Sequence, residues 1–230
     1  MLNREQKERS QSEIICIEDL VPENHLLRKI DETVDFTKIY DIVGKLYSAD
    51  KGRPSTDPVV LFKAAMIQHI YGIPSLRRTA EEIRLNIAYR WFLGYSLTEK
   101  TPHFSTFSYN FSHRFTEDVV QQIFNWILNE INDAGYLSPE AVFIDGTQIH
   151  TPELRKLYDR RKETIERVFA VAKEKHSMRF TYFRGLARVT NWVRLKFAAM
   201  NLKKYVLHRW LYCFFSHFLS SFSVFKFLAA

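Results

Sequence analysis

Apolar residues recur at helical spacing through residues 20–135, and this spacing is broken repeatedly by residues that begin or end helices. Asp57 and Ser75 are placed to cap helices, and Gly94 and Gly135 each stand where a helix should stop. The helix that follows Asp57 is apolar on most sides, so it needs partners on more than one face. This pattern predicts a compact, nearly all-helical domain within residues 1–135.

The bounds of the expected elements follow from these signals. Residues 14–17 are expected to form a short strand or an extended arm, and residues 21–25 a turn that leads into the first helix. Helices are expected over residues 26–34, 35–47, 57–71, 75–83, 86–92, 106–114 and 116–134.

The residue pattern changes after residue 135. Residues 141–144 form a short apolar run that ends in Asp145-Gly146, which suits a buried strand followed by a turn. Helical spacing returns over residues 153–175 and 191–206. The chain is therefore expected to be mainly α, with a small α/β part in residues 136–205.

Charge is divided unevenly along the chain. Residues 1–150 hold 16 Lys and Arg against 21 Asp and Glu, whereas residues 151–205 hold 15 against 5. A basic block of this density favours a polyanionic partner, most simply nucleic acid. A solvated helix face rich in Lys and Arg explains it equally well, and charge alone leaves both interpretations open.

Two carboxylates are candidates for chemistry, and each also has a plain structural explanation. Asp145, directly after an expected buried strand, can hold a hard cation, but Asp-Gly also makes a simple turn. Glu166, Phe169 and Lys173 share one helix face, which lets Glu166 point into a cleft while Lys173 reaches for phosphate. The plain explanation is that Glu166 only pairs with neighbouring Arg and Lys side chains.

Several motifs together resemble one family. Residues 75–78 (SLRR), 86–94 (NIAYRWFLG) and 106–108 (TFS) resemble the N-terminal, InsH-type domain of bacterial insertion-sequence transposases. Residues 143–147 (FIDGT) are similar to the strand that carries the first acid of their DDE domain, and the pattern of Glu166, Phe169 and Lys173 is similar to the helix that carries the last. With further similarity in residues 175–179, 184–186 and 198–204, the resemblance covers nearly all of residues 14–205.

The resemblance implies an RNase H-like catalytic domain that cleaves and transfers DNA strands. In the intact family, three acids hold two divalent metal ions, Mg²⁺ or Mn²⁺, which activate the nucleophile and stabilise the leaving oxygen. Asp145 would be the first of these acids and Glu166 the last. Three carboxylates are needed because a pair of hard dications wants several anionic oxygens.

The chain departs from the family between these two acids. Asp145 and Glu166 are 21 positions apart, whereas the family places its second Asp and most of its central sheet in this interval. Asp159 is the one aspartate between them, and it lies within an expected helix. We therefore expect an internally deleted copy, with its junction near residues 150–152, a truncated catalytic remnant in residues 136–205, and a defective site at which a metal need not bind.

The basic block is expected to contact DNA phosphates, with affinity that is mostly independent of sequence and sensitive to salt. The expected contacts are Arg160, Arg161, Lys173, Lys175, Arg179, Arg184, Arg188, Lys203 and Lys204. Tyr182 and Trp192 can stack on exposed bases, although each can equally line a core. By analogy with the family, Arg77, Arg78, Arg84 and Arg90 can read transposon ends.

The expected partners are transposon-end and target DNA, with a second copy or a full-length transposase as a protein partner. The alternative function is that of a non-catalytic DNA-binding remnant or a regulator of transposition.

Residues 206–230 form an apolar and aromatic tail. Its length could span a bilayer, but His208, Arg209 and several serines interrupt it, which favours packing on the core or a frayed end over a membrane anchor. Cys16 and Cys213 fit no disulfide or metal spacing. Because residues 1–12 are polar and charged, no signal peptide is expected, and the predicted location is the cytoplasm, with the nucleoid.

Overall fold

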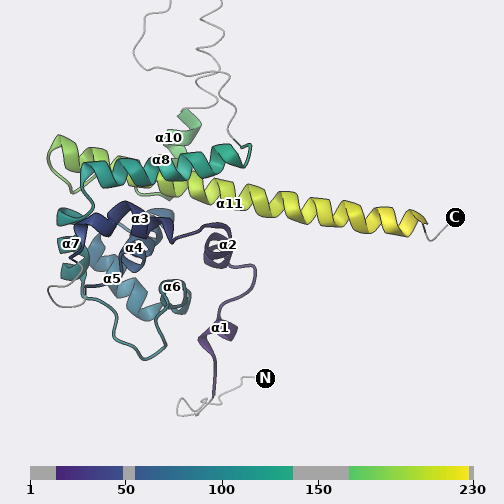
Figure 1. Cartoon of the computed structure of the whole chain (residues 1–230), viewed down its shortest axis with the longest axis horizontal. Coiled ribbons are helices and arrows are strands. Elements are labelled where there is room, and N and C mark those ends of the chain that lie inside the picture. The colour runs from purple at the N-terminus through teal and green to yellow at the C-terminus, as the bar shows by residue number, and fades with distance from the viewer. Residues whose placement is uncertain (1–13, 49–54, 137–165, 228–230) are drawn as a thin grey trace, which may run out of the picture.

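The computed structural model describes residues 14–48, 55–136 and 166–227 (Figure 1). These residues are built from α-helices with one 3-10 turn, and no strand occurs within the described ranges. The prediction of a mainly α chain is confirmed. The predicted strand over residues 141–144 lies outside the described residues.

Most helices of the N-terminal part begin and end close to the predicted bounds. The helices are α1 (Ile17–Leu20), α2 (Leu26–Thr33), α3 (Lys38–Val43), η1 (Gly44–Leu46, 3-10), α4 (Pro58–Ile70), α5 (Leu76–Leu85), α6 (Ile87–Leu93), α7 (Phe104–His113) and α8 (Glu117–Asp133). The Asp57 carboxylate accepts the N–H of Val59 at 2.7 Å, and the Ser75 hydroxyl accepts the N–H of Arg78 at 3.2 Å. Both capping predictions are therefore confirmed.

Three predicted elements differ from the structure. Residues 14–17 were expected to be extended, but α1 begins at Ile17. The predicted helix over residues 35–47 is shorter and tightens into η1 at Gly44. Helix α7 begins earlier than predicted because His103, rather than Thr106, is its N-cap, with the imidazole accepting the N–H of Ser105.

Helix α4 lies at the centre of the molecule. It is buried along most of its length, and it contacts α3, α5, α6 and α11. On one side the Phe62 ring lies 6.2 Å from the ring of Phe36 and 6.1 Å from that of Trp126, a residue of α8. The surrounding helices explain why the sequence of α4 is apolar on most sides.

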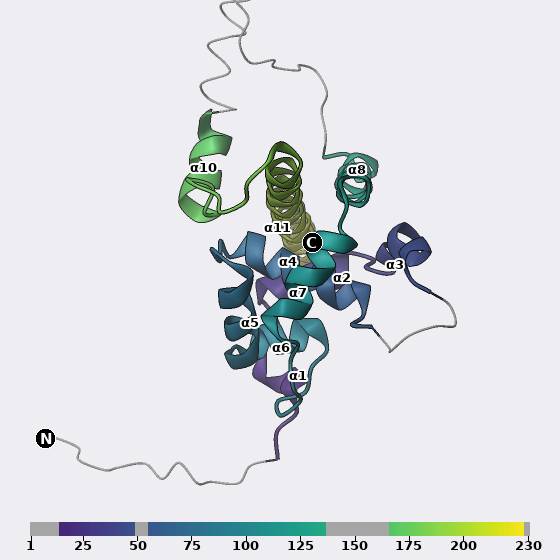
Figure 2. The ribbon, with the colours of Figure 1, turned by 90° about the vertical axis from the view of Figure 1, so that its left-hand side faces the viewer.

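Two helices follow in the basic part of the chain, α10 (Arg167–Lys175) and α11 (Leu186–Phe227). Helix α11 packs on α8, α4 and α2, and Figure 2 shows it end-on between α10 and α8. Its buried residues on this side are Leu195, Ala198, Ala199, Met200, Leu202, Tyr205 and Val206.

Helix α11 then continues past the helical body towards the C-terminus (Figure 1). It passes without a break through residues 205 and 206, where the sequence predicts the start of an apolar tail. In the described part of the chain, no helix combines the length and the apolarity needed to cross a membrane.

Candidate nucleic-acid interface

The basic segment is anchored to the helical domain at the C-terminal end of α4. His176, directly after α10, is 3% exposed, and its Nδ1 donates to the carbonyl oxygen of His69 at 2.8 Å. Lys196 of α11 is also buried, and its Nζ donates to the carbonyl oxygen of His176. The hydroxyl of Ser177 donates to the carbonyl oxygen of Gly72. These bonds hold α10 and α11 to α4.

Gly72 allows this close approach. Its φ is +64°, in the left-handed region that favours glycine, and a Cβ at this position would lie 2.8 Å from the carbonyl oxygen of Lys175. The backbone after α10 therefore lies directly against the backbone after α4. A larger residue at position 72 would push the two segments apart.

Burial sets the electrostatics of this junction. Burial, with smaller contributions from the charges of Lys196 and His176, lowers the pKa of His69 to about 3, so this imidazole is neutral. Burial also lowers the pKa of Lys196 to about 8. The Lys196 ammonium lies 4.8 Å from the centre of the Trp192 ring, a cation–π contact that offsets part of the lost hydration.

A groove of about 240 Å³ runs beside the junction, where the connection between α10 and α11 folds back. We call it the basic–aromatic groove after Lys173, Arg179, Phe180, Tyr182, Phe183, Trp192 and Lys196, and the carboxylate-bearing Glu174 lines it as well. Phe180 and Tyr182 are 63% and 72% exposed, and their rings meet edge to face at 5.5 Å. Exposed aromatic rings beside cations suit a nucleic-acid strand, whose bases stack while its phosphates pair with Lys and Arg.

Two of the predicted DNA contacts, Lys173 and Arg179, line the basic–aromatic groove. Arg179 forms an ion pair with Glu174, and both side chains are exposed, so the pair is weak and open to exchange for phosphate. Arg184 is exposed in the connection before α11. Arg160 and Arg161 lie outside the described residues.

The remaining predicted contacts lie on α11, apart from Lys175, which is exposed at the end of α10. Lys203 is half-buried, and burial together with the charge of Lys175 lowers its pKa. Lys204 lies farther along α11, beside Tyr205 in a pocket of about 310 Å³. Arg188 lies in the first turn of α11 and lines a different cavity, next to the groove. The predicted contacts that the structure describes are therefore spread over several sites.

The arginines of the N-terminal helices are mostly engaged within the protein. Arg90 is 4% exposed, and its Nε donates to the carbonyl oxygen of Ser96 at 2.9 Å. Arg78 pairs with Glu82 at 2.8 Å. Because its guanidinium is buried and donates to main-chain carbonyl oxygens, Arg90 is not placed to read DNA.

The structure places one of the two predicted catalytic acids. Asp145 lies outside the described residues, and Glu166 is exposed just before α10. Phe169, expected to anchor α10, is 44% exposed and meets the Phe197 ring at 6.0 Å. Ala172, which is fully buried, anchors the helix instead.

The fit of a metal can be judged on the described residues. Within them, no three His, Cys, Asp or Glu side chains gather as metal ligands would. Glu166 is a single exposed carboxylate with Arg167 beside it, whereas a pair of divalent ions needs several anionic oxygens. The described residues therefore do not fit a two-metal centre, and no catalytic step follows from them.

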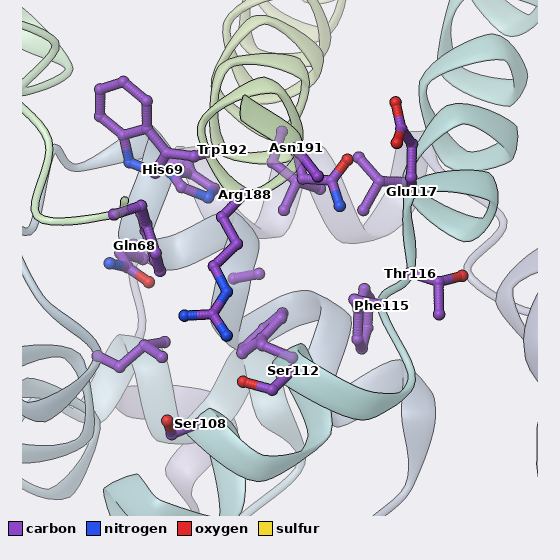
Figure 3. Close-up of a pocket in the computed structure, with 17 residues that line it drawn as sticks. Gln68, His69, Ser108, Ser112, Phe115, Thr116, Glu117, Arg188, Asn191 and Trp192 are labelled. Atoms are coloured by element: carbon purple, nitrogen blue, oxygen red, sulfur yellow. The ribbon is translucent and has the colours of Figure 1, made fainter. Parts of the chain in front are cut away.

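A second cavity of about 210 Å³ adjoins the groove, because Phe183 and Trp192 line both (Figure 3). Residues of α4, α5, α7, α8 and α11 meet in it. Two of its lining residues carry buried polar atoms with no hydrogen-bond partner in the described structure, Nδ1 of His69 and Oδ1 of Asn191. This cavity could not be predicted from the sequence, since its residues come from five helices and from the connection before α11.

Comparison with known families places the chain among transposases. The model described as "Transposase domain (DUF772)" matches residues 15–113, which include α1 to α7, and the model described as "Transposase DDE domain" matches residues 143–206, which include α10 and the part of α11 that packs on the body. No curated protein and no solved structure matches the chain. Both matching models describe enzymes that move DNA. The chain belongs to the insertion-sequence transposase family, with an N-terminal transposase domain followed by a DDE segment.

Proposed function

We propose that this chain binds DNA through the basic–aromatic groove and acts in transposition as a DNA-binding member of its family that does not complete strand cleavage and transfer. The observation that carries the binding proposal is the meeting of exposed rings and cations in one groove, with Tyr182 beside Lys173 and Arg179. The groove lies in the DDE segment, at its junction with the N-terminal domain.

Lys and Arg side chains bind phosphate oxygens whatever the base sequence, and they release counterions in doing so. Exposed rings add stacking on bases, which is also tolerant of sequence. The groove therefore supports binding that is sensitive to salt and favours DNA with accessible bases. Sequence preference would have to come from contacts elsewhere.

The second half of the proposal rests on the interval between Asp145 and Glu166. These residues are 21 positions apart, and the family uses a third acid from this interval to hold its metals. Asp159 is the one aspartate there. The sequence of this interval predicts mostly helix and no strand that could carry a second acid, so we propose a copy that retains DNA binding and lacks a complete set of metal ligands.

Binding is tested by fluorescence anisotropy of labelled DNA over a salt series. Lys173→Gln is expected to weaken binding uniformly across DNA sequences and to lower the salt slope by about one. Lys38→Gln, at an exposed lysine of α3, is the matched control and is expected to leave the slope unchanged. Equal effects of the two substitutions would contradict binding in the groove.

Catalysis is tested by incubating the protein with Mg²⁺ or Mn²⁺ and DNA that carries the inverted repeats bordering its gene. We expect bound DNA and no cleaved or joined product. Metal-dependent strand transfer that Asp145→Ala abolishes would show that the active centre is complete.

A further inference from the structure

The rim of the cavity in Figure 3 carries hydrogen-bond donors from three helices. They are the guanidinium of Arg188 on α11, the hydroxyls of Ser108 and Ser112 on α7, and the side-chain amide of Gln68 on α4. Figure 3 shows Arg188 extending from α11 past Gln68 towards the two serines. The donors come from both matched parts of the chain, since α4 and α7 lie in the N-terminal domain and α11 in the DDE segment.

The charge of Arg188 is not neutralised by any described residue. Its guanidinium forms no hydrogen bond or ion pair with the part of the chain that the structure describes. Glu117 is a carboxylate that lines the same cavity, but it pairs with Arg194 at 3.0 Å. Because Arg194 offsets the charge of Glu117, Arg188 gives the rim a positive charge and is free to bind an anion.

Gln68 gives a second, independent indication of a ligand. This residue is 6% exposed, and its side-chain amide forms no hydrogen bond with a described residue. Unlike Nδ1 of His69, the amide atoms of Gln68 are not sealed from solvent, so they face the cavity that Gln68 lines. Buried polar groups are nearly always hydrogen-bonded, and this amide is placed to donate to a group bound at the rim.

The two serines of α7 are also free to donate. Ser108 and Ser112 are four positions apart, so they share one face of the helix. Both are exposed, and neither hydroxyl bonds to another described residue. The hydroxyl of Thr79 on α5, by contrast, donates to the carbonyl oxygen of Ser75 at 2.9 Å. The serine hydroxyls can therefore donate to an oxygen that lies between α7 and Arg188.

We propose that these four side chains bind one phosphate of DNA held in the basic–aromatic groove, so that the strand continues from the groove onto α7. This inference rests on the proposed DNA binding. Arg, Ser and Gln side chains are common donors to the phosphate oxygens of DNA, and a guanidinium can hold a phosphate through two bonds at once. Phe183 and Trp192 line both the groove and the cavity, so the two sites adjoin. We call the four side chains the α7 phosphate site.

The α7 phosphate site gives the N-terminal domain a part in DNA binding that does not depend on the arginines of α5 and α6. Phosphate contacts position DNA without reading its sequence. A strand bound at both sites would cross the junction between the two matched parts of the chain. The site would therefore fix the direction in which DNA leaves the groove.

The first test measures the anisotropy of labelled DNA over a salt series. Arg188→Gln is expected to weaken binding about fivefold and to lower the salt slope by about one, because one phosphate contact is lost. Lys38→Gln removes the same charge from an exposed position of α3 and is expected to change neither quantity. Equal effects of these two substitutions would overturn the proposal.

A second test concerns α7 itself. Ser112→Asp places a carboxylate in the α7 phosphate site, whereas Ser105→Asp places the same charge on an exposed position of the same helix outside the cavity. Only Ser112→Asp is expected to weaken DNA binding, by about tenfold, because its carboxylate competes with phosphate for Arg188. Equal binding by the two variants would place the DNA away from α7 and would overturn the proposal.

A neutral double variant separates the hydroxyl contacts from the charge. Ser108→Ala combined with Ser112→Ala is expected to weaken binding about fivefold and to leave the salt slope unchanged, since no charge is removed. Both positions are exposed, so the fold is expected to tolerate the change. Unchanged affinity would show that the hydroxyls do not touch DNA, which contradicts the site.

These measurements also separate the α7 phosphate site from the DNA binding on which it rests. If Lys173→Gln weakens binding while the serine variants bind like the wild type, DNA occupies the groove without reaching α7, and this inference alone is overturned. If the wild-type chain binds no DNA, the proposed function is contradicted as well.

Discussion

At the scale of single residues, Gly72 carries the tightest constraint in the junction. It combines a positive φ with a carbonyl oxygen 2.8 Å from where a Cβ would stand. Gly72→Ala is expected to lower the free energy of unfolding by about 2 kcal/mol or more, measured by urea denaturation. Gly94→Ala is the control, since Gly94 has a φ of +78° and open space around it. Equal losses from the two substitutions would show that the close approach has no energetic weight.

His69 makes stability depend on pH. Burial lowers the pKa of His69 to about 3, whereas the unfolded chain binds this proton near pH 6.5. The unfolded state therefore binds more protons between these values, so stability is complete above about pH 6.5 and is lost as the pH falls towards 3. His69→Gln is expected to make the decrease shallower in urea denaturation at several pH values.

The control for this prediction is His113→Gln, at an exposed histidine, which is expected to leave the pH dependence as it is. His176 is buried as well, and burial likewise lowers its pKa, so a residual slope remains in His69→Gln. A slope identical to that of the wild type would contradict a neutral, buried imidazole at position 69.

At the scale of elements, α10 is held by a small side chain. Ala172 is fully buried, and the backbone that follows it lies against Gly72. Ala172→Leu has no space to occupy, so it is expected to displace α10 and to lower the free energy of unfolding by about 1–3 kcal/mol in urea denaturation. Ala170→Leu, exposed on the same helix, is expected to change it little. If Ala172→Leu left the free energy of unfolding unchanged, this would contradict the docking of α10 on the helical domain.

Helix boundaries set by local signals could be predicted, and the packing between helices could not. Asp57 and Ser75 cap helices through their own side chains, and such signals are visible in a few adjacent residues. The predicted start of α7 was wrong because a histidine, His103, acts as the N-cap of this helix. The contact between His176 and His69 joins residues 107 positions apart, and no periodicity in either segment indicates it.

The same distinction holds for the candidate site. Lys173, Arg179, Tyr182 and Trp192 could be named from the sequence, because a basic block with aromatic residues is a visible pattern. Their meeting in one groove is a property of the fold. The adjoining cavity could not be predicted, since only the fold brings together the helices whose residues line it.

At the scale of the whole molecule, an acidic helical domain and a basic segment form one body. The residues matched by the two transposase models contact each other through His69, Gly72, His176 and Lys196. The groove lies at this contact, which places the positive charge of the later segment on the rigid support of α4. DNA bound in the groove would contact the DDE segment, and the N-terminal helices would hold that segment in place.

Amide hydrogen exchange of the full chain, measured with and without bound DNA, tests this account most directly. We predict slower exchange in residues 173–196, the segment that forms the basic–aromatic groove and its junction with α4. Protection confined to α5, α6 and α7, with none in residues 173–196, would contradict it and would place the DNA on the N-terminal helices instead.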